Sequence, residues 1–216
     1  MAGARSYEDP CGVARALDVV GERWALLVVR ELLFGPKRFT DLRAGLPTAS
    51  QNVLSTRLRE LEEAGLVHKR KLPPPAASSV YELTERGADL QPVLFHLARW
   101  GSRGPITTTN GLSIDALVLA MLTTFDGERA ASLRVRAQLR LGADEFRLAI
   151  EHGLLDLERG TVDNPDVTIE ADTATFRAVI FGLRELDQAV SIKGDEALGR
   201  ELLTLFPRPT PAGSGS

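Results

Sequence analysis

The segment 50–64 alternates hydrophobic and polar positions with the period of an α-helix. Leu54, Leu58 and Leu61 fall on one narrow stripe, and Ser50 is suited to cap the helix. The opposite side holds short donor–acceptor side chains and charged residues: Asn52, Ser55, Thr56, Arg59 and Glu63. Side chains of this kind can reach base edges in the major groove of DNA, although a solvated helix surface is the alternative interpretation.

Three shorter helical patterns precede this segment, in residues 11–20, 22–33 and 37–46. The Gly35-Pro36 pair separates the second from the third. In the first helix the apolar residues share one face: Val13, Ala16, Leu17 and Val20. In the second helix we expect four residues to be buried: Trp24, Leu27, Val28 and Leu32. In the third helix we expect Phe39 and Leu42 to be buried.

Two strands and a long helix are predicted after the segment 50–64. Residues 66–72 and 79–83 have the composition of antiparallel strands, and the three prolines at 73–75 require a loop between them. Thr84 then caps a helix that we expect to continue to Trp100, with one apolar side formed by Leu90, Val93, Leu94, Leu97 and Trp100. The order of these elements predicts a winged helix-turn-helix whose recognition helix is the segment 50–64.

A polar, turn-rich segment then separates a second domain of different character. We predict a winged-helix domain at 1–101, a linker at 102–111, an α+β domain at 112–206 and a disordered tail at 207–216. In the second domain the apolar residues from Ile114 to Phe125 have helical spacing. Strands are then predicted near residues 133–141, 146–150, 155–157 and 167–169. Turns are predicted near Gly142 and Gly153. Asp172 is expected to cap a helix that carries Phe176, Val179, Ile180 and Leu183, followed by a strand near 190–193 and a last helix with Leu198, Leu202 and Leu205. The fold class is therefore α+β.

The charge balance differs between the two halves. Residues 1–104 carry 15 Lys and Arg against 12 Asp and Glu, whereas residues 105–216 carry 11 against 17. A mildly basic half suits contact with nucleic acid. The chain has no apolar run near the ~20 residues that cross a bilayer, and its start lacks an apolar signal core. With a single cysteine, the sequence predicts a cytoplasmic protein with no membrane partner.

Motifs across residues 11–101 closely resemble the HxlR-type transcriptional regulators. The resemblance rests on Gly21 with Arg23-Trp24, Arg30-Glu31-Leu32, Phe39 with Leu42, Leu54 with Arg57-Leu58, Tyr81 with Leu83-Thr84, and Trp100-Gly101. It implies a homodimer that binds double-stranded operator DNA through two winged helices. It also implies that the first helix and the helix ending at Trp100 pair the subunits.

The chain departs from the family at the wing and before the recognition helix. The family usually carries an arginine near Ser78 or Ser79, whereas the tip here is uncharged, and Thr48-Ala49 replaces a glycine and a larger aliphatic residue. Cationic wing contacts must then come from the strand residues 68–71. We expect Arg57 to brace the fold. The predicted DNA-contacting residues are Ser50, Gln51, Asn52, Ser55, Thr56, Arg59, Lys37, Arg38, Lys69 and Lys71.

The second half is similar to the sterol-carrier-protein-like domains. The stretches 165–182 and 189–206 carry this resemblance, with a strand, a capped helix, a further strand, Gly194-Asp195 and a closing helix. It implies an apolar small-molecule effector in an interior lined by Met121, Phe125, Phe176 and Ile180. An alternative function is a carrier or sequestration protein for a hydrophobic metabolite.

A third function is a cysteine-based oxidant sensor. Cys11 lies at a predicted helix start, where a thiol pKa falls, and a small buried inert thiol is the simpler interpretation. The scattered His68, His96 and His152 lack metal-ligand spacing, so we predict no metal site. The sequence has neither a glycine-rich phosphate loop nor a nucleophile–base pair, and we therefore expect no cofactor and no enzyme.

Overall fold

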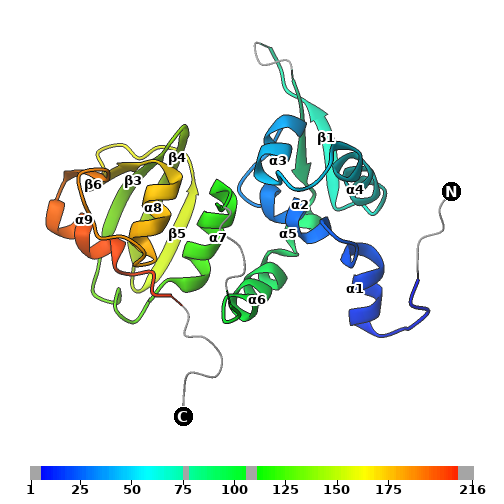
Figure 1. Ribbon diagram of the computed structural model, residues 1–216, viewed down its shortest axis with the longest axis horizontal. Coiled ribbons are helices and arrows are strands. Elements are labelled where there is room, and N and C mark those ends of the chain that lie inside the picture. The colour runs from blue at the N-terminus through cyan, green and yellow to red at the C-terminus, as the bar shows by residue number, and fades with distance from the viewer. Residues whose placement is uncertain (1–5, 75–77, 106–110, 209–216) are drawn as a thin grey trace. The chain divides into compact units, whose positions relative to one another are not determined.

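The computed structural model describes residues 6–74, 78–105 and 111–208, and it divides into two compact units, Met1–Leu94 and Phe95–Ser216 (Figure 1). The two units are described separately. In the described ranges no helix is both long and apolar enough to span a bilayer. Most of the predicted linker and tail, together with the centre of the wing tip, lies outside the described residues, so these predictions stay untested.

The first unit has the element order of a winged helix-turn-helix. Its elements are α1 (Gly12–Val20), α2 (Ala25–Leu32), α3 (Phe39–Gly45), α4 (Gln51–Glu63), β1 (Val67–Lys71), β2 (Ser79–Leu83) and α5 (Glu85–Ala88), and α6 (Gln91–Gly101) spans the division between the units. The strands β1 and β2 pair in antiparallel register and extend beyond α3 and α4 in Figure 1. The predicted helices before the wing and the hairpin itself are thus confirmed.

The core of the first unit lies where the leucine stripe predicts it. Leu54, Leu58 and Leu61 of α4 are buried together with Val28 and Leu42. The segment Glu22–Trp24 was predicted as helix, but α2 begins only at Ala25 because Trp24 adopts a left-handed φ of 78°. Phe39 and Trp24 are only half-buried, and the prediction that Leu27 is buried was wrong.

The long helix predicted between Thr84 and Trp100 is wrong. Thr84 caps the short helix α5, which ends at Ala88, and α6 begins three residues later. Pro92 gives the physical reason: in one continuous helix its ring would clash with the carbonyl group of Ala88. The exposed apolar residues of α1 and α6 are Val13, Leu17, Val93, Leu97 and Trp100.

The second unit is a five-stranded sheet with helices on one face. Its elements are α7 (Ile114–Thr124), β3 (Val135–Leu141), β4 (Asp144–Glu151), β5 (Leu154–Arg159), β6 (Val167–Ala171), α8 (Thr173–Ile180), β7 (Ser191–Gly194) and α9 (Glu196–Leu203). The strand order is β5-β4-β3-β6-β7, with β3 and β6 parallel and the other pairs antiparallel. In Figure 1 helix α8 lies across this sheet. The mixed α+β class is therefore confirmed.

Most predicted patterns of the second unit correspond to its strands and helices, but two residues depart from them. Gln138, placed on the polar face by alternation, is buried: its amide donates to the carbonyls of Phe146 and Gly160 and accepts from the Val162 amide at 2.8 Å. Leu183 was expected on the helix capped by Asp172, but α8 ends before it and Leu183 is exposed. The Asp172 cap is confirmed, and so are the turns at Gly142 and Gly153, which have positive φ.

Candidate nucleic-acid interface

Helix α4 is held with its polar side outward. The Ser50 hydroxyl accepts from the Val53 amide at 3.3 Å and caps the helix. The buried leucine stripe fixes the rotation of α4 about its axis, because a different rotation would expose those leucines. The predicted contact residues on its outer side are exposed or half-exposed: Gln51, Asn52, Ser55, Thr56 and Arg59.

Arg59 makes only a weak, exposed ion pair within the chain. Its nearest carboxylate is that of Glu63, one turn away, with 3.9 Å between Nε and Oε1. Both side chains are about two-thirds exposed, and such surface pairs are weak. Arg57 behaves as predicted: it is 12% exposed, ion-paired to Glu22 at 3.5 Å and hydrogen-bonded to Glu60.

The wing strand β1 has two differently charged sides. His68 and Arg70 each contact a carboxylate oxygen of Glu82 at 2.7 Å, and the Arg70 hydrogen bond lowers the pKa of that carboxyl. Lys69 and Lys71 point to the other side because strand side chains alternate. The Lys69 ammonium group lies over the Tyr81 ring, and both Lys69 and Lys71 are exposed residues. The Lys69–Lys71 side is therefore the cationic side of the wing.

Lys37 and Arg38 have different environments although they are adjacent. The Lys37 ammonium lies 2.7 Å from Oε2 of Glu31, and its side chain is only 12% exposed. Glu31, which is fully buried, also binds Arg30 at 2.6 Å. Arg38 remains exposed at the start of α3, where its amide donates to the Asp41 carboxylate. The structure thus commits Lys37 to an internal ion pair and leaves Arg38 accessible.

Glu31 has a structural role that its sequence context did not lead us to expect. A Cβ atom on Gly45 would lie 2.1 Å from Oε2 of Glu31, so α3 approaches this carboxylate closely. One signal was available in the sequence: at 100° per residue, Glu31 falls between Leu27 and Val28, on the apolar side predicted for this helix. A charge at such a position needs partners, which Arg30 and Lys37 provide.

The C-terminal end of α4 is anchored to α5. The Thr84 hydroxyl donates to the Gly65 carbonyl at 2.7 Å, and Arg86 donates to the Ala64 carbonyl at 2.6 Å. A Cβ atom on Gly87 would lie 2.0 Å from the carbonyl oxygen of Leu66, so the backbones are in direct contact. Helix α5 thus fixes the end of the candidate recognition helix.

The remaining candidate residues are in two places. Met121, Phe176 and Ile180 are buried in the second unit, and the half-buried Phe125 ring lies 5.9 Å from that of Phe206. Cys11 is exposed at the start of α1, contrary to the buried interpretation. Hydrogen bonds from the backbone amides of Ala14 and Val13 lower the pKa of its thiol.

Comparison with known proteins agrees with this geometry. Residues 19–105 match the family model described as HxlR-like helix-turn-helix. The chain is 39% identical over 88 residues to the uncharacterized HTH-type transcriptional regulator YvaP of Bacillus subtilis, which covers 41% of this chain and 82% of the relative. It is 36% identical over 88 residues to the HTH-type transcriptional regulator YodB of the same organism, covering 41% and 79%.

Among solved structures, the reduced form of YodB from B. subtilis is 34% identical and covers 44% of this chain and 94% of that one, with a TM-score of 0.40. The identity to YvaP and YodB extends over more than two thirds of each relative. The residues that match the family model, 19–105, include α4 and both strands of the wing. The chain therefore belongs to the HxlR-like helix-turn-helix family of transcriptional regulators.

Proposed function

We propose that this DNA-binding transcriptional regulator inserts α4 into the major groove of a double-stranded operator. The observation that supports the proposal is the polar outer face of α4, which the buried stripe of Leu54, Leu58 and Leu61 holds outward. In helix-turn-helix proteins the second helix of the motif reads base edges from such a position.

Each side chain has a role that its chemistry suggests. Asn52 and Arg59 are suited to bidentate pairing with adenine and guanine, respectively. Ser50, Gln51, Ser55 and Thr56 lie at the edges of the same face and are suited to phosphate or base contacts. Arg38, Lys69 and Lys71 are exposed cations that we assign to phosphates; we leave out Lys37 because Glu31 holds its ammonium group.

We infer that the protein binds DNA as a homodimer on a palindromic site. The apolar side chains Val13 and Leu17 of α1, and Val93, Leu97 and Trp100 of α6, are exposed in the single chain. Exposed apolar groups on neighbouring turns of one helix favour contact with another protein surface. Two copies related by a two-fold axis would present their recognition helices to half-sites about one helical turn (~34 Å) apart.

Substitution on the outer face of α4 tests the interface. Operator fragments are first selected from random duplexes with the wild-type protein. We expect Asn52→Ala and Arg59→Ala each to weaken specific binding about tenfold to a hundredfold, as lost bidentate contacts do. Arg140→Ala, which removes an exposed arginine from the sheet of the second unit, is the matched control. Wild-type affinity in both α4 variants would exclude the proposed groove contacts.

The second unit is the proposed effector domain. A sheet with helices on one face, with Met121, Phe176 and Ile180 in its interior, is consistent with the sterol-carrier resemblance and an apolar ligand. We further propose that the regulator works in the cytoplasm. Native mass spectrometry of freshly purified protein tests the effector: a retained apolar molecule supports the proposal, and ligand-free protein after growth in rich medium argues against it.

An oxidant sensor is a second candidate function, favoured by the exposed thiol of Cys11 and its lowered pKa. Because the thiolate is the nucleophile, we expect Cys11 to react with iodoacetamide at neutral pH faster than free cysteine. An intersubunit disulfide would give a dimer band on a non-reducing gel after oxidation, absent in Cys11→Ser. An alkylation rate equal to that of free cysteine, with no such band, would rule out this sensor.

A further inference from the structure

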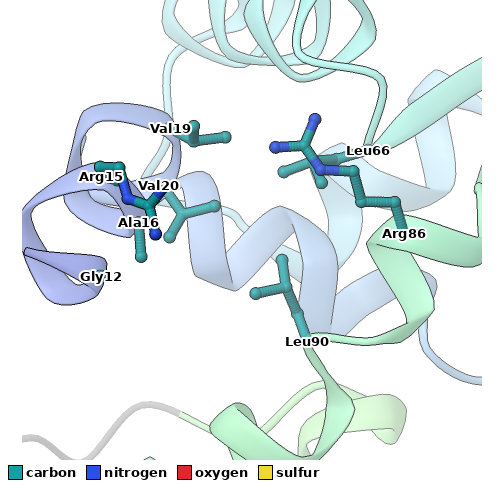
Figure 2. Close-up of a pocket in the computed structure, with 8 residues that line it drawn as sticks. All are labelled: Gly12, Arg15, Ala16, Val19, Val20, Leu66, Arg86 and Leu90. Carbon is teal, nitrogen blue, oxygen red and sulfur yellow. The ribbon is translucent and has the colours of Figure 1, made fainter. Parts of the chain in front are cut away.

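A groove in the first unit separates α1 from α5 and the start of β1. Its volume is about 470 Å³, and Figure 2 shows the side chains that line it. Its apolar lining comes from Val19 and Val20 of α1, Leu66 before β1, and Leu90 after α5. This volume is within the range of about 300–1,000 Å³ that small-molecule sites in proteins have.

Two arginines give the groove a positive charge. Arg15 projects from α1, and Arg86 extends from α5 toward α1 (Figure 2). None of the described residues that line the groove is acidic. In the described part of the chain the Arg15 guanidinium has neither a hydrogen bond nor an ion pair, and Arg86 uses one N–H group on the Ala64 carbonyl. The groove therefore presents unused guanidinium donors beside an apolar surface.

The two arginines and the apolar surface together indicate the kind of ligand that the groove can bind. A guanidinium group binds a carboxylate through two parallel hydrogen bonds, and the adjoining apolar surface favours a hydrocarbon or aromatic body. We propose that the groove binds a small apolar carboxylate, held between Arg15 and Arg86, as an effector of DNA binding. The site is distinct from the effector domain proposed in the second unit.

Arg86 connects the groove to the recognition helix. The carbonyl that it binds belongs to Ala64, the C-cap residue that follows α4. A carboxylate in the groove draws the guanidinium group away from that carbonyl and loosens the last turn of α4. The expected consequence is weaker DNA binding in the presence of the ligand, and this consequence, unlike the binding site itself, rests on the proposed function of α4.

Fluorine NMR of the full chain tests the site without DNA. The probe is para-trifluoromethylbenzoate, and para-trifluoromethylbenzyl alcohol is its uncharged counterpart. We expect the carboxylate to bind the wild type, and to bind at least about tenfold more weakly to Arg15→Gln, which lacks one charge-assisted hydrogen-bonding group. Ala16→Phe, which fills the groove from an exposed helix position, should also abolish binding. Arg103→Gln, in the second unit, is the matched control and should bind as the wild type does.

Four results would overturn the proposal in whole or in part. Equal binding of the acid and the alcohol, or of the acid to the wild type and to Arg15→Gln, would exclude the arginine site. If the carboxylate does not bind the wild type, and Ala16→Phe changes the oligomeric state, then a second copy of the chain covers the groove. Binding that leaves the DNA affinity of the wild type unchanged would exclude the effector role. Because the NMR assay contains no DNA, its result on ligand binding remains valid even if α4 does not read the operator.

Discussion

The wing of the first unit and the outer face of the sheet in the second unit both expose cations, but they pair them differently. On the sheet, Arg140 lies directly across from Glu145 at 3.0 Å, and Arg147 lies across from Glu158 and contacts it. The hydrogen bond to Glu158 raises the pKa of the Arg147 guanidinium group. On the wing, Lys69 and Lys71 have no carboxylate partner within the described residues.

This difference shows that the number of exposed cations does not identify a DNA-binding surface. A phosphate gains little from an arginine whose charge a neighbouring carboxylate already offsets. An exposed lysine without such a neighbour contributes its full charge. We therefore expect the wing lysines to attract phosphates more strongly than the sheet of the second unit, although that sheet also carries exposed arginines.

The largest expected effect is a loss of folding stability on substitution of Glu31, the residue with which the first unit pairs two of its cations. Glu31→Gln would leave Arg30 and Lys37, which are 17% and 12% exposed, without their carboxylate. Removing one member of a buried ion pair destabilises a protein by about 3 kcal/mol or more. Urea unfolding followed by the fluorescence of Trp24, in a Trp100→Phe background, measures this loss. Glu63→Gln, at the exposed pair with Arg59, is the control and should lower the free energy of unfolding by less than about 1 kcal/mol.

A smaller effect is expected from the unpaired lysines of the wing. Lys69→Gln combined with Lys71→Gln removes two proposed phosphate contacts, so the slope of log K against log salt concentration should become shallower by about two. Titrations of a random duplex at several salt concentrations measure the slope. Arg140→Gln combined with Arg147→Gln removes the same charge from the sheet and should leave the slope unchanged. Equal slopes in the two double variants would show that the wing lysines contribute no more to phosphate binding than the paired arginines of the sheet.

Local patterns predicted most of the fold. The period of Leu54, Leu58 and Leu61 is a property of one helix, and the alternation in β3 and β4 is a property of single strands, so both could be identified in the sequence. The break before α6 was also present in the sequence, in Pro92, but apolar periodicity continued through it. Periodicity reports which residues share a face and not whether that helix is continuous.

The environment of individual site residues was harder to predict. Lys37 and Arg38 look alike in sequence, and only the approach of α2 to α3 brings Glu31 to Lys37. The neutralisation of Arg70 depends on the strand register, which places Glu82 across from His68. For the same reason, the exposed Leu17 could not be identified from apolar spacing, because spacing does not reveal which surface covers a face. Such ion pairs form between residues that the tertiary structure brings together, so the local sequence does not reveal them.

The smallest effect is expected at Glu82, the one carboxylate that makes part of the wing resemble the sheet. Glu82→Gln would release His68 and Arg70, and at low salt it should strengthen non-specific DNA binding by about threefold or less, since exposed charges are partly screened.

The pH dependence of this variant follows from the lowered pKa of Glu82. A carboxyl whose pKa is lower in the folded chain stabilises that chain above its ordinary pKa, and this contribution is lost as the pH falls through the lowered value. The stability difference between wild type and Glu82→Gln should therefore be larger above the ordinary pKa of the carboxyl and should vanish in acid. Urea unfolding across this range measures it. A difference that persists in acid would mean that Glu82 stabilises the wing by packing, and the electrostatic contrast with Lys69 and Lys71 would then have another origin.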